Sequence, residues 1–297
     1  MTYEPLTAKR FHASRKFSET AFGRIAYVER GSGPAALFVH GALLNGFQWR
    51  HQLAGLSSMR RVIAPDSMAM GYTEMNPAQK LGMKAQAAML LAFIDSLGLE
   101  RVDLVGNDSG GGAAQILAAE HPERVRTLTL TDCEVHDYDE SAPGSLRFRK
   151  AAASGALAEA LKAVVQSPAA GRRAFASAYQ RVDALPDEVF ATYAAPLVAS
   201  AQRIEQLAAY VAATTNKDLI AVAPQLRVLP VPALVLWGTA DDFFPLERAK
   251  WLEQNLPHVE ELVELPGARV FWPEEQPELL NRKLSEFWTR HASAGHA

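Results

Sequence analysis

The residues best suited to chemistry lie at positions 106–110, which read Gly-Asn-Asp-Ser-Gly. An apolar run ends there and an Ala-rich helical pattern begins at once, so the segment predicts a strand that turns directly into a helix. The central residue of such a turn has a strained backbone and an exposed side chain, which suits a nucleophile, and the residues two positions away must be small. Glycines at both ends of the segment therefore place Asp108 at the centre. A turn centred on Ser109 would put an asparagine where a small residue is needed.

Short apolar runs elsewhere in the chain predict the strands that must position Asp108. Most of these runs are continuously apolar and do not alternate with polar residues, which is typical of parallel strands buried on both faces. Segments with a helical period separate the runs. This alternation is typical of a parallel sheet covered by helices on both faces. The chain opens instead with an expected antiparallel hairpin, at 15–20 and 24–30. The expected parallel strands are 35–39, 61–65, 102–105, 126–131, 233–237 and 260–265, and the expected helices are 49–56, 84–97, 109–120, 245–255 and 277–291.

Residues 137–227 break the alternation, because no buried strand occurs there and Ala-rich helical segments follow one another. We interpret this interval as a helical cap domain inserted into an α/β core domain of residues 1–136 and 228–297. The helical segments expected in the cap are 146–153, 156–165, 171–181, 188–197 and 201–211.

Composition limits the classes of partner. The chain has 297 residues, 48% of them hydrophobic, and a net charge of −3, which predicts one large core and gives no electrostatic reason to bind nucleic acid or an anionic membrane. Residues 1–16 lack the apolar core of a signal peptide, and no window is long and apolar enough for a membrane span. The single Cys133 excludes internal disulfides and agrees with a reducing compartment. We therefore expect a cytoplasmic protein, monomeric or homodimeric.

The sequence calls for no cofactor and no metal. It contains no phosphate-binding Walker loop, no dinucleotide-binding fingerprint and no His/Cys cluster at ligand spacing. The glycine-rich turn at 106–111 follows a strand, but the acid at Asp108 would repel a phosphate. We expect a small-molecule substrate alone.

Several motifs occur in the order found in the α/β-hydrolase superfamily, which the chain resembles from about residue 23 to residue 288. They are the turn at His40-Gly41, the turn at 106–110, the segment 237–241 (Trp-Gly-Thr-Ala-Asp) and the segment 267–277 with its Pro-Glu-Glu-Gln-Pro end. The turn at 106–110 looks like that of the aspartate-nucleophile branch, the haloalkane dehalogenases and epoxide hydrolases. The resemblance implies an α/β-hydrolase fold, with a mostly parallel eight-stranded sheet flanked by helices and an inserted helical cap.

The resemblance also implies a two-step reaction. A carboxylate, here Asp108, attacks a carbon that bears a leaving group and forms an alkyl ester. A histidine held by a second carboxylate then activates water to hydrolyse the ester, while the backbone N–H groups of Ala42 and Ser109 stabilise the oxyanion. Asp241 is the favoured second carboxylate, and Asp132 is the alternative used by some dehalogenases.

The chain departs from this family at the catalytic histidine. The family usually has Gly-Ala-Gly-His-Phe after the last strand, whereas this chain has Gly-Ala-Arg-Val-Phe, so Val270 occupies the histidine position. Valine has no proton to exchange and cannot activate water. His136 leaves a parallel strand at its carboxyl end, where the sites of such sheets lie, and is therefore the candidate replacement base.

The residues expected around the leaving group also differ from the family. Ser109 and Ala42 stand where haloalkane dehalogenases generally have halide-binding Trp or Asn, and the turn after His40 lacks the proline of epoxide hydrolases. The expected cap contains three tyrosines, of which Tyr179 and Tyr193 are expected at the substrate and Tyr210 is the third. The residues expected to contact substrate are His40, Leu43, Asn107, Tyr179, Tyr193 and Phe271.

Three functions remain open at this point. The first is a hydrolase of the dehalogenase or epoxide hydrolase kind, with Asp108 attacking a small apolar substrate between core and cap and with a non-standard or missing histidine base. The second is an enzyme in which Asp108 is the general base of a non-hydrolytic step. The third is a catalytically impaired hydrolase fold that binds a ligand, since a fold does not carry its function with it.

Overall fold

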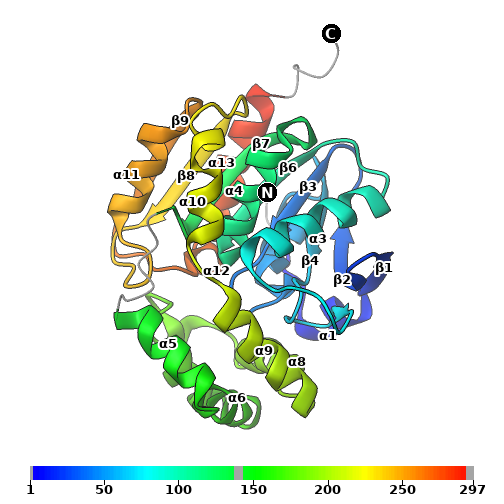
Figure 1. Ribbon diagram of the computed structural model, residues 1–297, viewed down its shortest axis with the longest axis vertical. Coiled ribbons are helices and arrows are strands. Elements are labelled where there is room, and N and C mark those ends of the chain that lie inside the picture. The colour runs from blue at the N-terminus through cyan, green and yellow to red at the C-terminus, as the bar shows by residue number, and fades with distance from the viewer. Residues whose placement is uncertain (1–2, 137–142, 292–297) are drawn as a thin grey trace.

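A computed structural model describes residues 3–136 and 143–291 of the chain. A twisted sheet lies at its centre, between two layers of helices (Figure 1). The strands follow the order β1-β2-β4-β3-β6-β7-β8-β9, with β5 paired to β2 outside this path. Their bounds are β1 Lys16–Thr20, β2 Gly23–Arg30, β3 Ala35–Val39, β4 Arg61–Pro65, β5 Glu74–Met75, β6 Val102–Asp108, β7 Val125–Cys133, β8 Ala233–Gly238 and β9 Val259–Leu265.

The sheet is mostly parallel. β2 pairs antiparallel with β1, β4 and β5, whereas β4, β3, β6, β7, β8 and β9 pair parallel to one another. All residues of β3 and β8 are buried, as expected for strands covered on both faces. The sequence predicted eight strands, and the structure has nine. The additional strand is β5, whose two residues carry no apolar run that a sequence pattern could detect.

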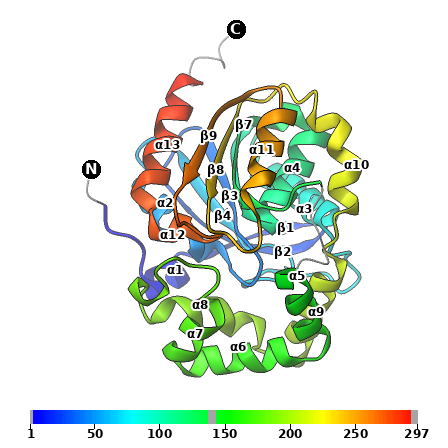
Figure 2. The same cartoon turned by 90° about the vertical axis from the view of Figure 1, so that its left-hand side faces the viewer.

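Two layers of helices cover the sheet. Helices α3, α4, α10 and α11 lie on one face, and α2 and α13 lie on the other (Figure 2). The short α1 and α12 lie near the ends of these layers. Their bounds are α1 Ala8–Ala13, α2 Arg50–Gly55, α3 Met83–Ser96, α4 Ser109–Glu120, α10 Lys217–Leu226, α11 Leu246–Asn255, α12 Trp272–Glu275 and α13 Pro277–Arg290, with short 3₁₀ turns at Gly46–Trp49, Pro122–Arg124 and Val182–Ala184.

Five helices lie between β7 and β8 in sequence and together form a separate layer, which we call the helical insertion (α5–α9). They lie beyond the carboxyl ends of the parallel strands, at the bottom of Figure 1. Their bounds are α5 Pro143–Ala153, α6 Ala156–Gln166, α7 Pro168–Phe175, α8 Glu188–Leu197 and α9 Ala201–Ala213. No helix in the described ranges is long and apolar enough to cross a membrane.

Helix α10 lies elsewhere than the sequence suggested. The expected cap, 137–227, included it, but α10 packs against α4 and α3 on the face of the sheet. Its buried side chains explain this placement, because Leu219, Val222 and Leu226 recur at helical spacing and cover the apolar surface of α4. The helical layer beyond the strand ends is therefore shorter than the expected cap, part of which, residues 137–142, lies outside the described residues.

Candidate active site

The turn from β6 into α4 has the geometry that its sequence predicts. β6 ends at Asp108 and α4 begins at the next residue, and Asp108 has φ 53° and ψ −133°, a conformation that costs energy for any residue except glycine. The glycines allow close passage of the neighbouring elements. A Cβ on Gly110 would lie 2.4 Å from the carbonyl oxygen of Val39 in β3, and one on Gly106 would lie 2.7 Å from that of Gly110.

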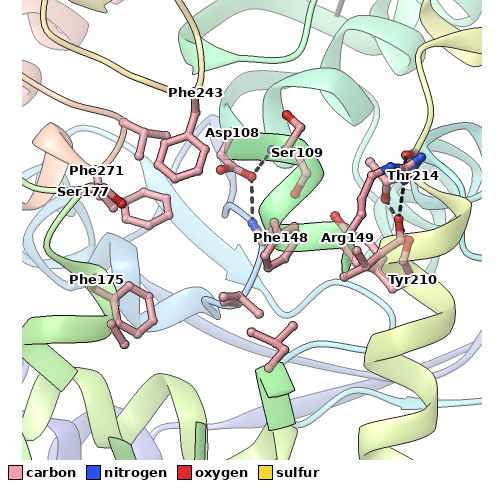
Figure 3. A pocket seen from close by; sticks show the side chains of 18 of the residues that line it. Asp108, Ser109, Phe148, Arg149, Phe175, Ser177, Tyr210, Thr214, Phe243 and Phe271 are labelled. Atoms are coloured by element: carbon pink, nitrogen blue, oxygen red, sulfur yellow. Dashed lines mark hydrogen bonds between the residues drawn. The ribbon is translucent and has the colours of Figure 1, made fainter. Parts of the chain in front are cut away.

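One oxygen of Asp108 is held by two backbone donors. Its Oδ1 accepts hydrogen bonds from the N–H of Ala42, at 2.9 Å, and from the N–H of Ser109. Both bonds meet at this atom in Figure 3, while the second oxygen lies on the side of Phe243 and Phe271. Burial raises the pKa of Asp108, and the two N–H donors oppose that rise because they stabilise the anion. The two expected oxyanion donors therefore converge on the carboxylate itself.

Asp108 faces a cavity of about 280 Å³ between the carboxyl ends of the strands and the helical insertion (Figure 3). A space of this size suits a small molecule. Its polar groups include those of Asp108, Ser109, Glu134, Tyr210 and Arg149. Most of the wall is apolar, and its larger side chains include Phe148, Leu161, Phe175, Val211, Phe243 and Phe271.

Val270 lies in the wall of this cavity and is 1% exposed. Its carbonyl oxygen accepts a hydrogen bond from Asn107 Nδ2 at 2.9 Å, so the loop after β9 is tied to the strand that carries Asp108. Among the described residues, no histidine contributes to the cavity wall. A base of the imidazole kind is thus missing from the described surface around Asp108.

The two candidate carboxylates, Asp132 and Asp241, lie next to each other rather than in separate places. Asp132 is fully buried and accepts hydrogen bonds from the Gly238 N–H at 2.9 Å and from Trp272 Nε1 at 2.6 Å. Asp241 Oδ1 accepts a hydrogen bond from the N–H of Phe243 at 2.8 Å. Burial raises the pKa of Asp241 to about 7, and burial together with the charge of Asp241 raises the pKa of Asp132 well above its usual value. Two adjacent buried carboxyls cannot both ionise cheaply, so this pair shares a proton at neutral pH.

His136 lies away from the cavity wall. Its ring stacks on Trp251 of α11, with centroids 3.9 Å apart and an interplanar angle of 22°. In this position the imidazole covers an aromatic ring instead of facing Asp108. The structure therefore does not place His136 where a replacement base is needed.

Two of the expected substrate contacts instead hold backbone in place. The ring of His40 accepts the Ser67 N–H through Nε2, at 2.9 Å, and Nδ1 lies 2.8 Å from the Gly41 carbonyl oxygen. Asn107 binds Gln48 through Oδ1 and two carbonyl oxygens besides that of Val270 through Nδ2. Both side chains are buried and lie outside the cavity wall formed by the described residues.

Tyr179 and Tyr193 also lie outside that wall. Their hydroxyls both donate hydrogen bonds to Glu274 of α12, which forms a buried ion pair with Arg50 of α2. These contacts satisfy the carboxylate and leave neither hydroxyl facing the cavity. The structure thus places these two tyrosines outside the wall formed by the described residues, whereas Leu43 and Phe271 lie in it.

Glu134 and Tyr210 lie in the cavity wall, and neither was among the residues selected from the sequence. Glu134 immediately follows β7, two residues after Asp132, and is 4% exposed. The Tyr210 hydroxyl, from α9, lies within hydrogen-bonding reach of the Ser109 side chain. The position of Glu134 at the carboxyl end of a parallel strand was a usable signal, because such ends meet at one edge of the sheet.

Comparison with known proteins agrees with this arrangement. A family model described as the alpha/beta hydrolase fold matches residues 34–275. The chain belongs to the α/β-hydrolase fold family. Haloalkane dehalogenase 2 of Mycobacterium bovis is 28% identical to this α/β-hydrolase, with 95% of each chain covered, and epoxide hydrolase 2 of Siraitia grosvenorii is 41% identical over 100 residues, or 33% of this chain and 32% of that protein.

The similarity to solved structures extends over the whole α/β-hydrolase fold. A crystal structure of a haloalkane dehalogenase from Bradyrhizobium elkani superposes with a TM-score of 0.78, at 23% identity, over 95% of this chain and 99% of that one. At this identity the match concerns the fold. This α/β-hydrolase is thus related at low identity to both haloalkane dehalogenases and epoxide hydrolases, and its similarity to hydrolases supports a hydrolytic activity.

Proposed function

We propose that this protein is a hydrolase in which Asp108 attacks a carbon that bears a leaving group, on a small and largely apolar substrate bound in the cavity. The observation that supports this most directly is the asymmetry of the Asp108 carboxylate. Its Oδ1 is held by the N–H groups of Ala42 and Ser109, and its other oxygen lies on the side of Phe243 and Phe271 (Figure 3). A fixed carboxylate beside an apolar space is a suitable nucleophile, since the attacking oxygen is oriented and poorly solvated.

The same donors serve both steps of the proposed reaction. In the first step, Asp108 Oδ2 forms a bond to the substrate carbon as the bond to the leaving group breaks, which gives an ester. In the second step, water attacks the Cγ of Asp108, and the negative charge that develops on Oδ1 is stabilised by the N–H groups of Ala42 and Ser109. Cleavage of the bond between Cγ and the ester oxygen releases the alcohol and regenerates the carboxylate.

Val270 makes the second step the slower one in this proposal. Without an imidazole to deprotonate the attacking water, hydrolysis of the ester loses a contribution of about 10² to 10⁴ in rate. An ester on Asp108 should therefore accumulate and be visible by mass spectrometry.

The test is intact-protein mass spectrometry after incubation with a panel of haloalkanes, epoxides and activated esters. We expect an adduct on the unmodified protein, none on Asp108→Asn, and faster loss of the adduct in Val270→His, in which Asp132 or Asp241 can orient the new imidazole. Turnover that is unchanged in Asp108→Asn would contradict the proposal.

A second candidate is an enzyme in which Asp108 removes a proton from the substrate in an elimination or isomerisation. The buried valine at position 270 favours it, because such a step needs no activated water. Reaction in ¹⁸O-labelled water separates the two candidates. The hydrolase transfers the label into Asp108 during a single turnover and into the product on later turnovers, whereas the second candidate transfers it to neither.

A further inference from the structure

Glu134 is a buried acid in the cavity whose side chain has an unsatisfied oxygen. It follows the last residue of β7, and Cys133 beside it pairs in register with Asp108 of β6. Its Oε2 finds no hydrogen-bond partner among the described residues, although the side chain is almost wholly buried. A Cβ placed on Gly112 would lie 3.7 Å from Oε2, so this oxygen lies beside the first turn of α4, the helix that Asp108 precedes.

A buried carboxyl without a partner is costly as an anion and much less costly as a neutral acid. Three ionisable groups from other elements interact with Glu134: Asp108 of β6, Tyr210 of α9 and Arg248 of α11. A fourth is Cys133, the last residue of β7 and the one before Glu134. Burial, followed by the charge of Asp108, raises the pKa of Glu134 well above its usual value, and its own backbone N–H and the charge of Arg248 oppose this only in part.

The two acids of the cavity therefore differ in what stabilises them. Asp108 receives two backbone N–H donors on one oxygen and can carry the negative charge. Glu134 Oε2 receives none from the described residues, and the neighbouring charge of Asp108 repels a second anion. These surroundings favour the negative charge on Asp108 and the proton on Glu134, because the backbone donors stabilise an anion only at Asp108.

We propose that Glu134 is the acid–base residue of the reaction, giving its proton to an oxygen leaving group in the first step and taking a proton from water in the second. This inference rests on the proposed function, because it requires an ester on Asp108. It assigns the work of the missing imidazole to a group that follows β7, whereas the predicted histidine position follows β9.

The protons balance over one cycle for a strained cyclic ether. Asp108 Oδ2 bonds to a ring carbon, the C–O bond of the ring breaks, and its oxygen takes the proton of Glu134. Water then adds to Cγ of Asp108 and gives one proton to the ionised Glu134. The ester C–O bond at Cγ breaks, and the departing oxygen keeps the second proton of that water, so the diol leaves while Asp108 is ionised and Glu134 is protonated, as at the start.

The leaving group distinguishes this role from a purely structural one. A halide leaves as a stable anion and needs no proton, so the first step with a haloalkane does not use Glu134. An oxygen that leaves as an alkoxide does need one. Loss of the proton should therefore slow ester formation from an epoxide and leave ester formation from a haloalkane nearly unchanged.

The experiment compares the protein with Glu134→Gln, using an epoxide with a hexyl chain and hexyl bromide as probes. Rapid quenching and intact-mass measurement give the rates at which the Asp108 ester forms and disappears. The control is Glu264→Gln, the same change at an exposed glutamate of β9 that does not line the cavity. In Glu134→Gln we expect ester formation from the epoxide, and hydrolysis of the ester formed from the epoxide, to fall about 100-fold or more, with bromide attack changed less than about threefold.

Different failures overturn different claims. Equal rates of formation and loss in Glu134→Gln and in the unmodified protein would overturn the role of Glu134 and leave the proposed function standing. Absence of an Asp108 ester, and of solvent ¹⁸O in Asp108, with both probes would overturn the proposed function and the role of Glu134 with it.

A measurement on the unmodified protein guards against misfolding of the variant. A protonated-carboxyl infrared band should be present at pH 7 and should shift on selective ¹³C labelling of glutamate. Glu134→Asp, which keeps an acid but shortens it, should restore part of the epoxide rate. A fully ionised Glu134 at pH 7, or the same loss with both probes in the first step, would overturn the proposal.

Discussion

At Asp108 the two oxygens of one carboxylate have different surroundings, and this asymmetry sets what the residue can do. Backbone donors hold Oδ1, so charge that develops on this atom finds its stabilisation already in place. The strained φ of 53° is the cost of presenting the side chain at the tip of the turn. The cavity wall around it includes a valine, Val270, and a second acid, Glu134.

The shared proton of Asp132 and Asp241 predicts a stability that falls as the pH rises. The pKa of Asp241 is about 7 in the folded protein and near 4 when unfolded, so the folded state binds more protons between these values. The contribution of this group to the free energy of unfolding is therefore full below about pH 4 and declines until about pH 7, at roughly 1.4 kcal/mol per pKa unit.

Asp241→Asn should make this dependence shallower. The amide of asparagine can donate a hydrogen bond to Asp132 at any pH and replaces the shared proton, so Asp132 can ionise at less cost. Urea unfolding at pH 5 and pH 8 measures the effect, with Asp242→Asn, a neighbouring exposed aspartate, as the control. A slope between the two pH values that is as steep in Asp241→Asn as in the unmodified protein would contradict the shared proton.

At the scale of elements, the close passage of β3, β6 and α4 determines where Asp108 lies. Gly110→Ala would place a methyl group 2.4 Å from the Val39 carbonyl oxygen and 2.5 Å from that of His40, and backbone atoms cannot move aside cheaply. We expect a loss of about 3 kcal/mol in the free energy of unfolding. Gly98→Ala is the comparison, since Gly98 has a positive φ, unlike Gly110, but its added methyl group would meet no atom within 4 Å, and it should cost about 1 kcal/mol from backbone strain alone. A loss in Gly110→Ala no larger than that in Gly98→Ala would contradict the cost expected from the close contact.

A buried ion pair of the core binds the helical insertion through a tyrosine hydroxyl. Arg50 of α2 and Glu274 of α12 are each 4% exposed, and Tyr193 of α8 donates its hydroxyl to the same carboxylate. Glu274→Gln leaves the buried arginine without a counter-charge, which costs about 3 to 5 kcal/mol. Glu253→Gln, the same change at an exposed glutamate of α11, should cost less than about 1 kcal/mol. Thermal unfolding checks both, and similar shifts of Tm would contradict a special role for the buried pair.

The sequence predicted those elements whose pattern lies within a few neighbouring residues. The runs that form β3 and β8, and the glycines around Asp108, depend on neighbours within a few residues, and they were located correctly. The residues whose positions differ from the prediction contact partners that are distant in the sequence. Tyr179 binds Glu274, 95 residues away, and His136 stacks on Trp251, 115 positions later, so no periodicity or spacing could reveal these contacts. Glu134 was not selected because its burial and its nearness to Asp108 are properties of the folded chain.

At the scale of the whole molecule, the cavity forms where the helical insertion lies over the carboxyl ends of the core strands. The core supplies Asp108 and Phe243, and the helical insertion supplies Leu161 of α6 and Phe175 of α7. Phe271, in the loop after β9, donates its backbone N–H to the carbonyl oxygen of Ala178 at 3.1 Å, which fixes this loop against the insertion. A ligand held between the layers should therefore stabilise the entire protein, not one domain alone.

This coupling can be measured with an unreactive ligand, hexanol, which matches the apolar wall and offers Asp108 no leaving group. Binding to the folded state alone adds about 2.7 kcal/mol at a ligand concentration of 100 times Kd and raises Tm accordingly. Leu161→Phe enlarges a side chain that is 2% exposed and lies in the wall, so it should abolish the rise in Tm, while Val165→Phe, one turn along the same helix and 38% exposed, should retain it. A rise that persists in Leu161→Phe would place the binding site outside the cavity, whereas two separate unfolding transitions, of which hexanol shifts only one, would mean that the insertion and the core do not share the ligand.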